Sequence, residues 1–257
     1  MTEKKERAKF VKATAESRIG RIKAVYRMGE VLTKRFDEQA GKMIFDPNHF
    51  VNKVAIGVEC LDADEFDMLP DEPMSHFVYV ELTDSMHAKA NKTQLLKSLE
   101  LEPTNTLGLL GKLVVVEGDL MTFDDGTVRF GGSKKKLKAP TARQATKHAD
   151  DQGKLTQTVF SIANPLLGTP FTQLNPYIRS KILTGKKGEA LKKTLLESGI
   201  TEEEMMKDIK LGMEARKAEE AKAEQAANKA EAELLASFTQ QPMTSTKPAD
   251  TDGDSPF

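Results

Sequence analysis

Residues Gly111–Phe130, GKLVVVEGDLMTFDDGTVRF, contain two short runs rich in Val, Leu and Phe, joined by Asp124-Asp125-Gly126. Such runs are typical of β-strands, because β-branched and aromatic side chains pack well on a pleated sheet. The Asp125-Gly126 pair favours the positive φ angles of a tight turn. The stretch therefore predicts an antiparallel hairpin, which we place at the centre of the fold.

Three further strand-like runs precede this hairpin: KMIFDP, NKVAIGVECL and HFVYVEL, within residues 42–82. The run NKTQLLKSLELEP, residues 91–103, predicts a short helix that stops before Pro103. The acidic run from Glu59 to Glu72 predicts a loop. The fold class is therefore predicted as α+β, with a small antiparallel β-sheet or an OB-like barrel over residues 41–140 as the nucleic-acid-binding core.

Helices are predicted on both sides of this core. Residues 5–38 carry apolar side chains at spacings of three and four, which indicates a basic amphipathic helix over residues 1–40. Residues 141–200 predict the helical part of the core. Thr201 and Glu204 form a capping-box pattern at the start of an exposed helix, residues 201–238. Residues 239–257 predict a disordered acidic tail.

Composition excludes several classes of protein. The 257 residues include one cysteine and four histidines without metal-ligand spacing, so no metal site is expected. The phosphate-cradling motifs GxxxxGK[ST] and GxGxxG are absent, as is the nucleophile motif GxSxG, so we expect neither an enzyme nor a cofactor. The start of the sequence lacks a signal peptide's apolar run and no apolar stretch would span a membrane, so a soluble intracellular protein is expected.

The net charge of −1 conceals strong segregation of charge along the chain. Residues 129–154 contain eight Lys or Arg against two Asp or Glu, whereas residues 59–72 contain seven acidic residues and no basic one. Basic clusters track a phosphate backbone and give sequence-tolerant affinity, and aromatic side chains on a sheet stack on unpaired bases. The predicted DNA-binding residues are accordingly Phe123, Arg129, Phe130, Lys134, Lys135, Lys136, Lys138, Arg143 and Lys147.

Two alternatives stay open for this region. The lysines can belong to a solvated loop with Phe123 and Phe130 in the core. A second basic set around Tyr177 and Arg179 can extend the same groove, or it can be the charged surface of a helix with Tyr177 buried.

The stretch DTDGDSPF combines Asp250, Asp252 and Asp254 with the apolar pair Pro256-Phe257. An acidic peptide of this kind can insert Phe257 into a partner's pocket while a basic rim holds the aspartates. It can also occupy the protein's own basic groove until DNA displaces it. An ordinary solubilising tail is the third possibility.

The stretch DTDGDSPF resembles the acidic tip of bacterial single-stranded DNA-binding proteins and the acidic, aromatic ends of bacteriophage single-stranded DNA-binding proteins. GKLVVVEGDLMTF followed by DDGTVRF is similar to the strand and hairpin of their OB-fold. The chain contains no tryptophan for base stacking, and its predicted helices have no counterpart in the small bacterial protein.

The resemblance implies a non-enzymatic single-stranded DNA-binding protein of bacteriophage type, in the cytoplasm of the host bacterium. It would act in DNA replication, recombination or transcription and recruit a DNA or RNA polymerase through its tip. A phage scaffolding or other structural protein is the alternative, and an adaptor that acts through the acidic loop is a third. The sequence permits a monomer or a dimer.

Overall fold

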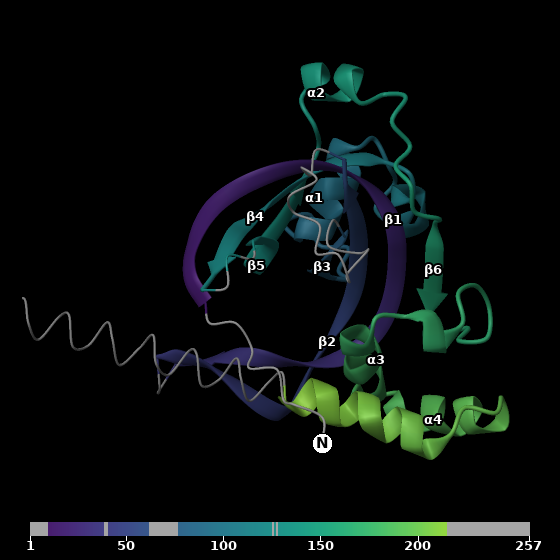
Figure 1. The fold of residues 1–257 in the computed structure, drawn as a ribbon. Coiled ribbons are helices and arrows are strands. Elements are labelled where there is room, and N and C mark those ends of the chain that lie inside the picture. Colours follow the sequence, from purple (N-terminus) through teal and green to yellow (C-terminus); the bar gives the residue numbers. More distant parts are fainter. Residues whose placement is uncertain (1–9, 39–40, 62–76, 125, 127, 215–257) are drawn as a thin grey trace, which may run out of the picture. The chain divides into compact units, whose positions relative to one another are not determined.

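The computed structural model describes residues 10–38, 41–61, 77–124, 126 and 128–214. Residues 1–212 belong to one compact unit and residues 213–257 to a second. The first unit is a mixed α+β structure built on a large antiparallel sheet (Figure 1). The predicted α+β class is confirmed at this level.

Five strands follow the order β3-β2-β1-β4-β5, and each pairs antiparallel with its neighbours. A sixth strand, β6, pairs parallel with the middle of β1. The strands are β1 (Phe10–Asp37), β2 (Lys42–Cys60), β3 (Phe77–Thr83), β4 (Leu113–Phe123), β5 (Val128–Lys138) and β6 (Thr158–Ser161). The helix α1 (Asn91–Ser98) lies in the chain between β3 and β4, followed by the 3-10 helix η2 (Thr106–Leu109).

The predicted N-terminal helix is wrong, because residues Phe10–Asp37 form the 28-residue strand β1. β1 pairs with β4 along Phe10–Arg21 and with β2 along Gly20–Asp37. It therefore runs through the centre of the sheet and curves along most of its length (Figure 1).

Register shifts in β1 explain why its sequence resembles a helix. Ile22 pairs with Val58 and Val25 pairs with Ile56, so one extra residue, Lys23, is inserted between them. An inserted residue is a β-bulge and interrupts the two-residue alternation of a strand. Ile22 and Val25 therefore reach the same side of the sheet at a spacing of three, which is also the spacing of a helix face.

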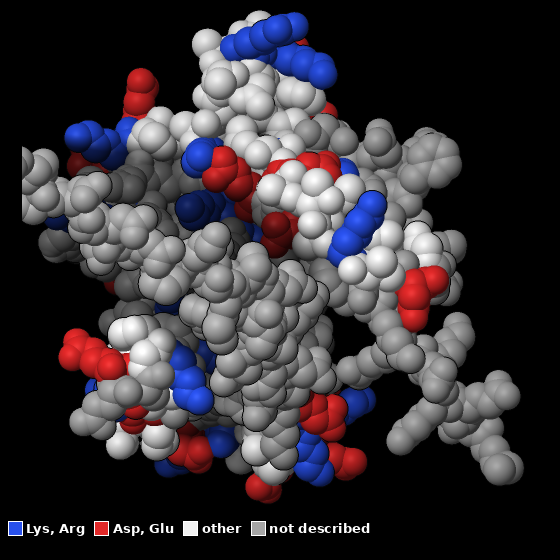
Figure 2. Space-filling view, turned by 90° about the vertical axis from the view of Figure 1, so that its left-hand side faces the viewer, with Lys and Arg blue, Asp and Glu red and all other residues white. Residues whose placement is uncertain are grey.

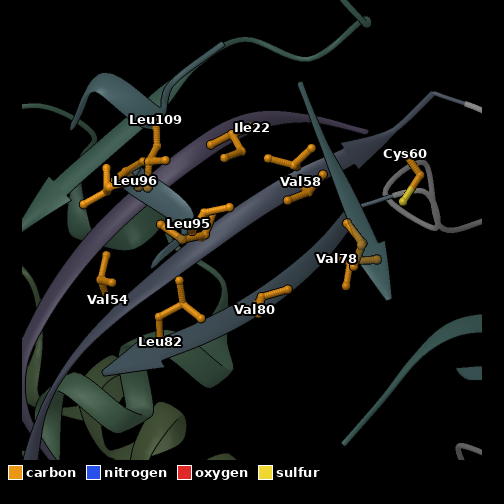
Figure 3. Close-up of a cluster of buried hydrophobic side chains, with 14 residues drawn as sticks. Ile22, Val54, Val58, Cys60, Val78, Val80, Leu82, Leu95, Leu96 and Leu109 are labelled. Atoms are coloured by element: carbon orange, nitrogen blue, oxygen red, sulfur yellow. The ribbon is translucent and has the colours of Figure 1, made fainter. Parts of the chain in front are cut away.

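The two faces of the sheet bury separate hydrophobic clusters. The first cluster contains Ile22 and Val25, the alternate residues of β2, β3 and β4, and Leu95 and Leu96 of α1. Figure 3 shows these two leucines among the strand side chains. The second cluster contains Ala24, Tyr26, Met28 and Val31 of β1, together with side chains of the C-terminal helices.

Gly57 allows the second face to pack closely. A Cβ atom at this position would lie 2.4 Å from Cζ of Phe77 and 2.8 Å from Cβ of Ala24. The ring of Phe77 therefore lies directly over the backbone of β2, and it packs edge-on against Tyr79, with ring centroids 5.0 Å apart.

The predicted β4–β5 hairpin and the predicted short helix are both confirmed. β4 and β5 pair antiparallel around a turn in which Gly126 has a φ of 82°, a conformation that glycine adopts without strain. The capping box is also confirmed, since Thr201 Oγ1 accepts a bond from Glu204 N and the Glu204 carboxylate accepts one from Thr201 N. It begins a helix that is described over residues 202–214.

Residues 141–200 contain more than helix. They form α2 (Ala142–Lys147), strand β6, the 3-10 helix η3 (Phe171–Gln173), α3 (Pro176–Leu183) and α4 (Gly188–Glu197). The helix α3 packs on β1, where Ile178 and Ile182 enter the second cluster. Among the described residues, no helix has both the length and the apolar character needed to cross a membrane.

A buried arginine attaches the α2–β6 connection to the sheet. The guanidinium of Arg21 donates to the carbonyl oxygens of Gly111, His148, Ala149 and Asp151 at 2.6–3.2 Å. Five N–H donors in a rigid fork suit this arrangement, which a lysine would not reproduce. Arg21 was predicted to belong to the basic, solvent-facing side of a helix. Its side chain instead joins separate parts of the fold.

Truncation of Leu96 tests the role of α1 in the first cluster. Leu96 is 0% exposed, whereas Leu107 is 49% exposed and serves as the matched control. Leu96→Ala should lower the free energy of unfolding by about 2–5 kcal/mol, because it removes buried methyl groups and leaves a cavity. Leu107→Ala should change it by less than about 1 kcal/mol. Equal, small losses in urea unfolding of both variants would contradict the packing described for α1.

Candidate functional site

Two adjoining surface depressions follow strand β3. The first has a volume of about 470 Å³ and is lined by Lys53, Glu81, Leu82, Thr83, Ser85, His87, Lys89, Ala90 and Asn91. The second has a volume of about 410 Å³ and is lined by Glu81, Leu82, Asn91, Gln94, Leu95, Ser98 and residues Lys135–Ala139. Because Glu81, Leu82 and Asn91 line both, we treat the two as one feature and call it the basic groove.

The lining of the basic groove is strongly cationic. Lys53 and Lys89 line its first half, and Lys135, Lys136 and Lys138 line its second half. Glu81 supplies the one carboxylate of this lining. A concave surface with one sign of charge attracts counter-ions of the opposite sign, so the groove suits an extended anion.

The groove forms where segments far apart in the sequence meet. Register places Lys53 of β2 opposite Thr83 of β3, and its Nζ atom lies 3.3 Å from Thr83 Oγ1. Lys89 lies in the turn that precedes α1, and Asn91 is the first residue of α1. Lys135 comes from β5, which contacts β3. The predicted residues Lys135, Lys136 and Lys138 are thus brought together with Lys53 and Lys89, which the sequence interpretation missed.

Glu81 is held by a lysine from outside the groove lining. Lys181 of α3 places its Nζ atom 2.5 Å from Glu81 Oε1 and 4.4 Å from the centre of the Tyr177 ring. Burial lowers the pKa of the Lys181 ammonium, but the Glu81 carboxylate and Tyr177 outweigh burial, so the pKa lies above its ordinary value. Lys181 therefore stays protonated and neutralises Glu81.

Lys53 and Lys135 have the opposite electrostatic environment. Burial lowers the pKa of each ammonium group, the Glu81 carboxylate partly offsets burial, and Lys181 lowers each pKa further. Within the described part of the chain, neither side chain makes an ion pair with a carboxylate. Both are therefore partly desolvated cations with capacity for an additional anion.

The other predicted groove lysines differ in how they are paired. Lys138 forms an ion pair with Glu117 of β4, which lies opposite Lys136 in the strand register. Both lysines are exposed, and no ion pair of Lys136 is found among the described residues. An exposed ion pair of this kind contributes little to stability and exchanges readily with solvent ions. Lys136 is thus the freer of these two cations.

The predicted aromatic residues occupy mixed positions. Phe130 is half-buried and packs against the first cluster, and the Arg18 guanidinium lies 5.3 Å from its ring centre. Phe123, Arg129 and Lys134 belong to the β4–β5 hairpin by backbone pairing, but their side chains lie outside the described part of the structure. Tyr177 is 38% exposed and is joined to the groove through Lys181.

Three predicted basic residues lie away from the groove lining. Arg143 and Lys147 are exposed on α2, which lies outside the strands of the sheet (Figure 1). Arg179 donates to the Thr172 carbonyl at 2.8 Å and pairs with Asp208 at 3.0 Å, with its side chain 19% exposed. Arg179 therefore joins α3 to the helix at residues 202–214 and has little surface for a ligand.

Figure 2 views the molecule from the side on which β4 and β5 lie in Figure 1. Basic side chains form separate groups with acidic side chains between them, and the uppermost group lies at the level of α2. A single continuous basic stripe is not present among the coloured residues of this face.

Two predicted features lie outside the described residues: the tip residues Asp250, Asp252, Asp254, Pro256 and Phe257, and residues 62–72 of the predicted acidic loop Glu59–Glu72. Glu59 and Cys60, predicted as the start of that loop, form the end of β2 instead. Within the residues that are described, no group of three His, Cys, Asp or Glu could hold a metal ion. Comparisons with protein-family models, curated proteins and solved structures found no match to this chain.

The sequence contains one further feature that was missed. Phe36 and Met43 pair across β1 and β2 near the chain reversal between them, and both are more than half exposed. Their neighbours Lys34 and Lys42 are basic. A strand prediction for residues 10–37 would have placed Phe36 on an exposed face by its two-residue alternation. We call the end of the β1–β2 pair that contains Phe36 and Met43 the β1–β2 ribbon.

Removal of Arg179 tests its structural role. Arg179→Ala leaves the Asp208 carboxylate, 10% exposed, without its cation and should lower the free energy of unfolding by about 1–3 kcal/mol near pH 7. Burial already raises the pKa of Asp208, and Arg179 opposes that effect. The pKa should rise further in the variant, so the loss is largest above this pKa and shrinks as the pH falls through it.

Urea unfolding at pH 7 and pH 4 measures this difference. Lys210→Ala, on the same helix, is the control. A pH-independent loss would contradict the role of the Arg179–Asp208 pair.

Proposed function

We propose that this protein binds single-stranded DNA in the basic groove and is of the bacteriophage single-stranded DNA-binding type. The observation that carries the proposal is the convergence of five lysines and one carboxylate on a concave surface built from β2, β3, α1 and β5. Lysines that contact phosphates release counterions and give affinity for any sequence. The protein would act in the host cytoplasm in replication, recombination or transcription, without catalysis.

An OB-like barrel is the architecture that we propose for the sheet. β1 pairs with both β2 and β4, a helix separates β3 from β4, and β3 contacts β5, which would bring the two ends of the strand order together. The first cluster would then fill the barrel, with Leu95 and Leu96 closing one end. OB-folds bind oligonucleotides through the face of strands 2 and 3 and the adjoining loops, and Lys53 and Glu81 belong to those two strands.

Exposed aromatic side chains support a preference for single strands. Tyr177 borders the groove through Lys181, and Phe36 lies on the β1–β2 ribbon. Stacking of an unpaired base on an aromatic ring contributes about 1–3 kcal/mol and is unavailable to a paired base. We propose that bases stack on Tyr177, while the half-buried Phe130 chiefly supports the hairpin.

The segment DTDGDSPF is proposed to recruit a replication or transcription protein, such as a polymerase. Its charge is opposite to that of the groove, so it would also compete with DNA for the lysines. This part of the proposal rests on sequence alone.

Fluorescence-polarisation titration with a labelled thymidine oligonucleotide tests the proposed function. Binding should be tighter than to a duplex of equal length, and the logarithm of the affinity should fall with the logarithm of the salt concentration with a slope of about −3. In the double variant Lys89→Ala/Lys136→Ala, affinity should fall roughly tenfold and the slope should become shallower by about 1.4.

The matched control is Lys97→Ala/Lys112→Ala, which removes two exposed lysines that do not line the groove. A flat salt response would contradict electrostatic binding. Equal losses in both double variants would move the binding site elsewhere, and absence of oligonucleotide binding at physiological salt would favour a scaffolding role.

A further inference from the structure

The junction of the two depressions has an unusual balance of charge. Glu81 lies in both depressions, and three lysines from three different elements act on it: Lys53 of β2, Lys135 of β5 and Lys181 of α3. One of the three, Lys181, makes the direct ion pair. The positive charge at the junction therefore exceeds the negative charge by two.

Nearby acidic groups do not correct this imbalance. Asp84, three residues beyond Glu81, is itself paired with Lys92 at 2.6 Å and lies 3.6 Å from Arg27. Glu117 is paired with Lys138. Lys53 lines the first depression and Lys135 lines the second, so the two lysines lie on either side of the shared residue Glu81. Among the described residues, neither has a carboxylate partner of its own.

We propose that Lys53 and Lys135 form a phosphate subsite at this junction, and that Glu81, held by Lys181, limits the affinity of the subsite. The inference rests on the proposed function, because the phosphate is taken to be a backbone phosphate of the bound strand. It deepens that function by naming the residues that contact the phosphate and the residue that opposes them.

A phosphate suits the junction better than a neutral ligand does. Two partly desolvated ammonium groups stabilise an anion more strongly than fully solvated ones, because the local dielectric is lower. The hydroxyl of Thr83, 3.3 Å from Lys53 Nζ, offers a further hydrogen-bond donor. Lysine binds phosphate as a point charge and does not require the fixed geometry of an arginine fork.

Glu81 has the opposite effect on the same phosphate. Its ionised carboxylate repels the phosphate and at the same time occupies the ammonium group of Lys181. Replacement by glutamine removes the repulsion and makes Lys181 available to the ligand. The subsite is therefore weaker than its lysines alone would make it, which permits release of the strand.

The test compares four single variants in the same oligonucleotide titration. Lys53→Met and Lys135→Met keep the aliphatic stem and remove the charge, and each should weaken binding roughly 3- to 10-fold and make the salt slope shallower by about 0.7. Glu81→Gln should strengthen binding by about threefold or more and make the slope steeper. Lys97→Met, outside the groove, should leave both quantities unchanged.

Thermal unfolding checks that each variant folds. Lys53→Arg keeps the charge and should retain wild-type affinity, so it replaces Lys53→Met in the comparison if that variant does not fold. If the wild type binds the oligonucleotide but the Lys53 and Lys135 variants match Lys97→Met, the subsite is wrong and the proposed function stands. Unchanged or weaker binding by Glu81→Gln would overturn the role of Glu81.

Inorganic pyrophosphate, measured by calorimetry, separates the two proposals. If the wild type binds pyrophosphate but no oligonucleotide, and Lys53→Met abolishes that binding, the subsite stands and the proposed function falls. If it binds neither, both are overturned.

Discussion

The fold depends on the backbone hydrogen bonds of β1, because this strand pairs with other strands along both of its edges. It also contains an inserted residue, Lys23, between Ile22 and Ala24. Along Phe10–Arg21 the strand pairs with β4, and along Gly20–Asp37 it pairs with β2. The insertion places Ile22 and Val25 in one cluster and Ala24 and Tyr26 in the other. One strand therefore supports two cores, and the position of β2 and β3 relative to β4 and β5 follows from it.

The distribution of ion pairs divides the charged residues into two groups. Arg21, Arg179 and Lys92 bind carbonyl or carboxylate partners and join elements of the fold. Lys53, Lys89, Lys135 and Lys136 line the groove without such partners in the described residues. Lys53 and Lys135 are the partly buried members of this set, and partly buried cations without partners reduce the stability of the folded state. We take their place in one concave surface as support for the proposed ligand site.

Part of the fold could be predicted because its signals are local. The β4–β5 hairpin follows from Asp125-Gly126 and its flanking Val and Phe residues, and α1 and the Thr201 capping box follow from local propensity. β1 could not be predicted in this way. Its bulges give the apolar residues a helix-like spacing, and a 28-residue strand is far longer than the usual five or six residues. Similarly, β6 is recognisable mainly through its pairing with β1.

The candidate site was predictable only where it is contiguous in sequence. The run from Lys134 to Lys138 was visible as a charge cluster, whereas Lys53, Glu81 and Lys181 are each isolated in the sequence and meet only through strand register and the packing of α3 on β1. Arg179 was misleading for the same reason, since its partner Asp208 lies 29 residues away in sequence, on another helix.

Hydrogen–deuterium exchange with and without a thymidine oligonucleotide tests the central claim, that the basic groove is the ligand site, most directly. The account predicts slower amide exchange on binding in residues 81–98 and 135–139, which contain most of the groove lining, with α2 and α4 unchanged. Slower exchange confined to α2, α4 or the β1–β2 ribbon, with the groove segments unaffected, would contradict it.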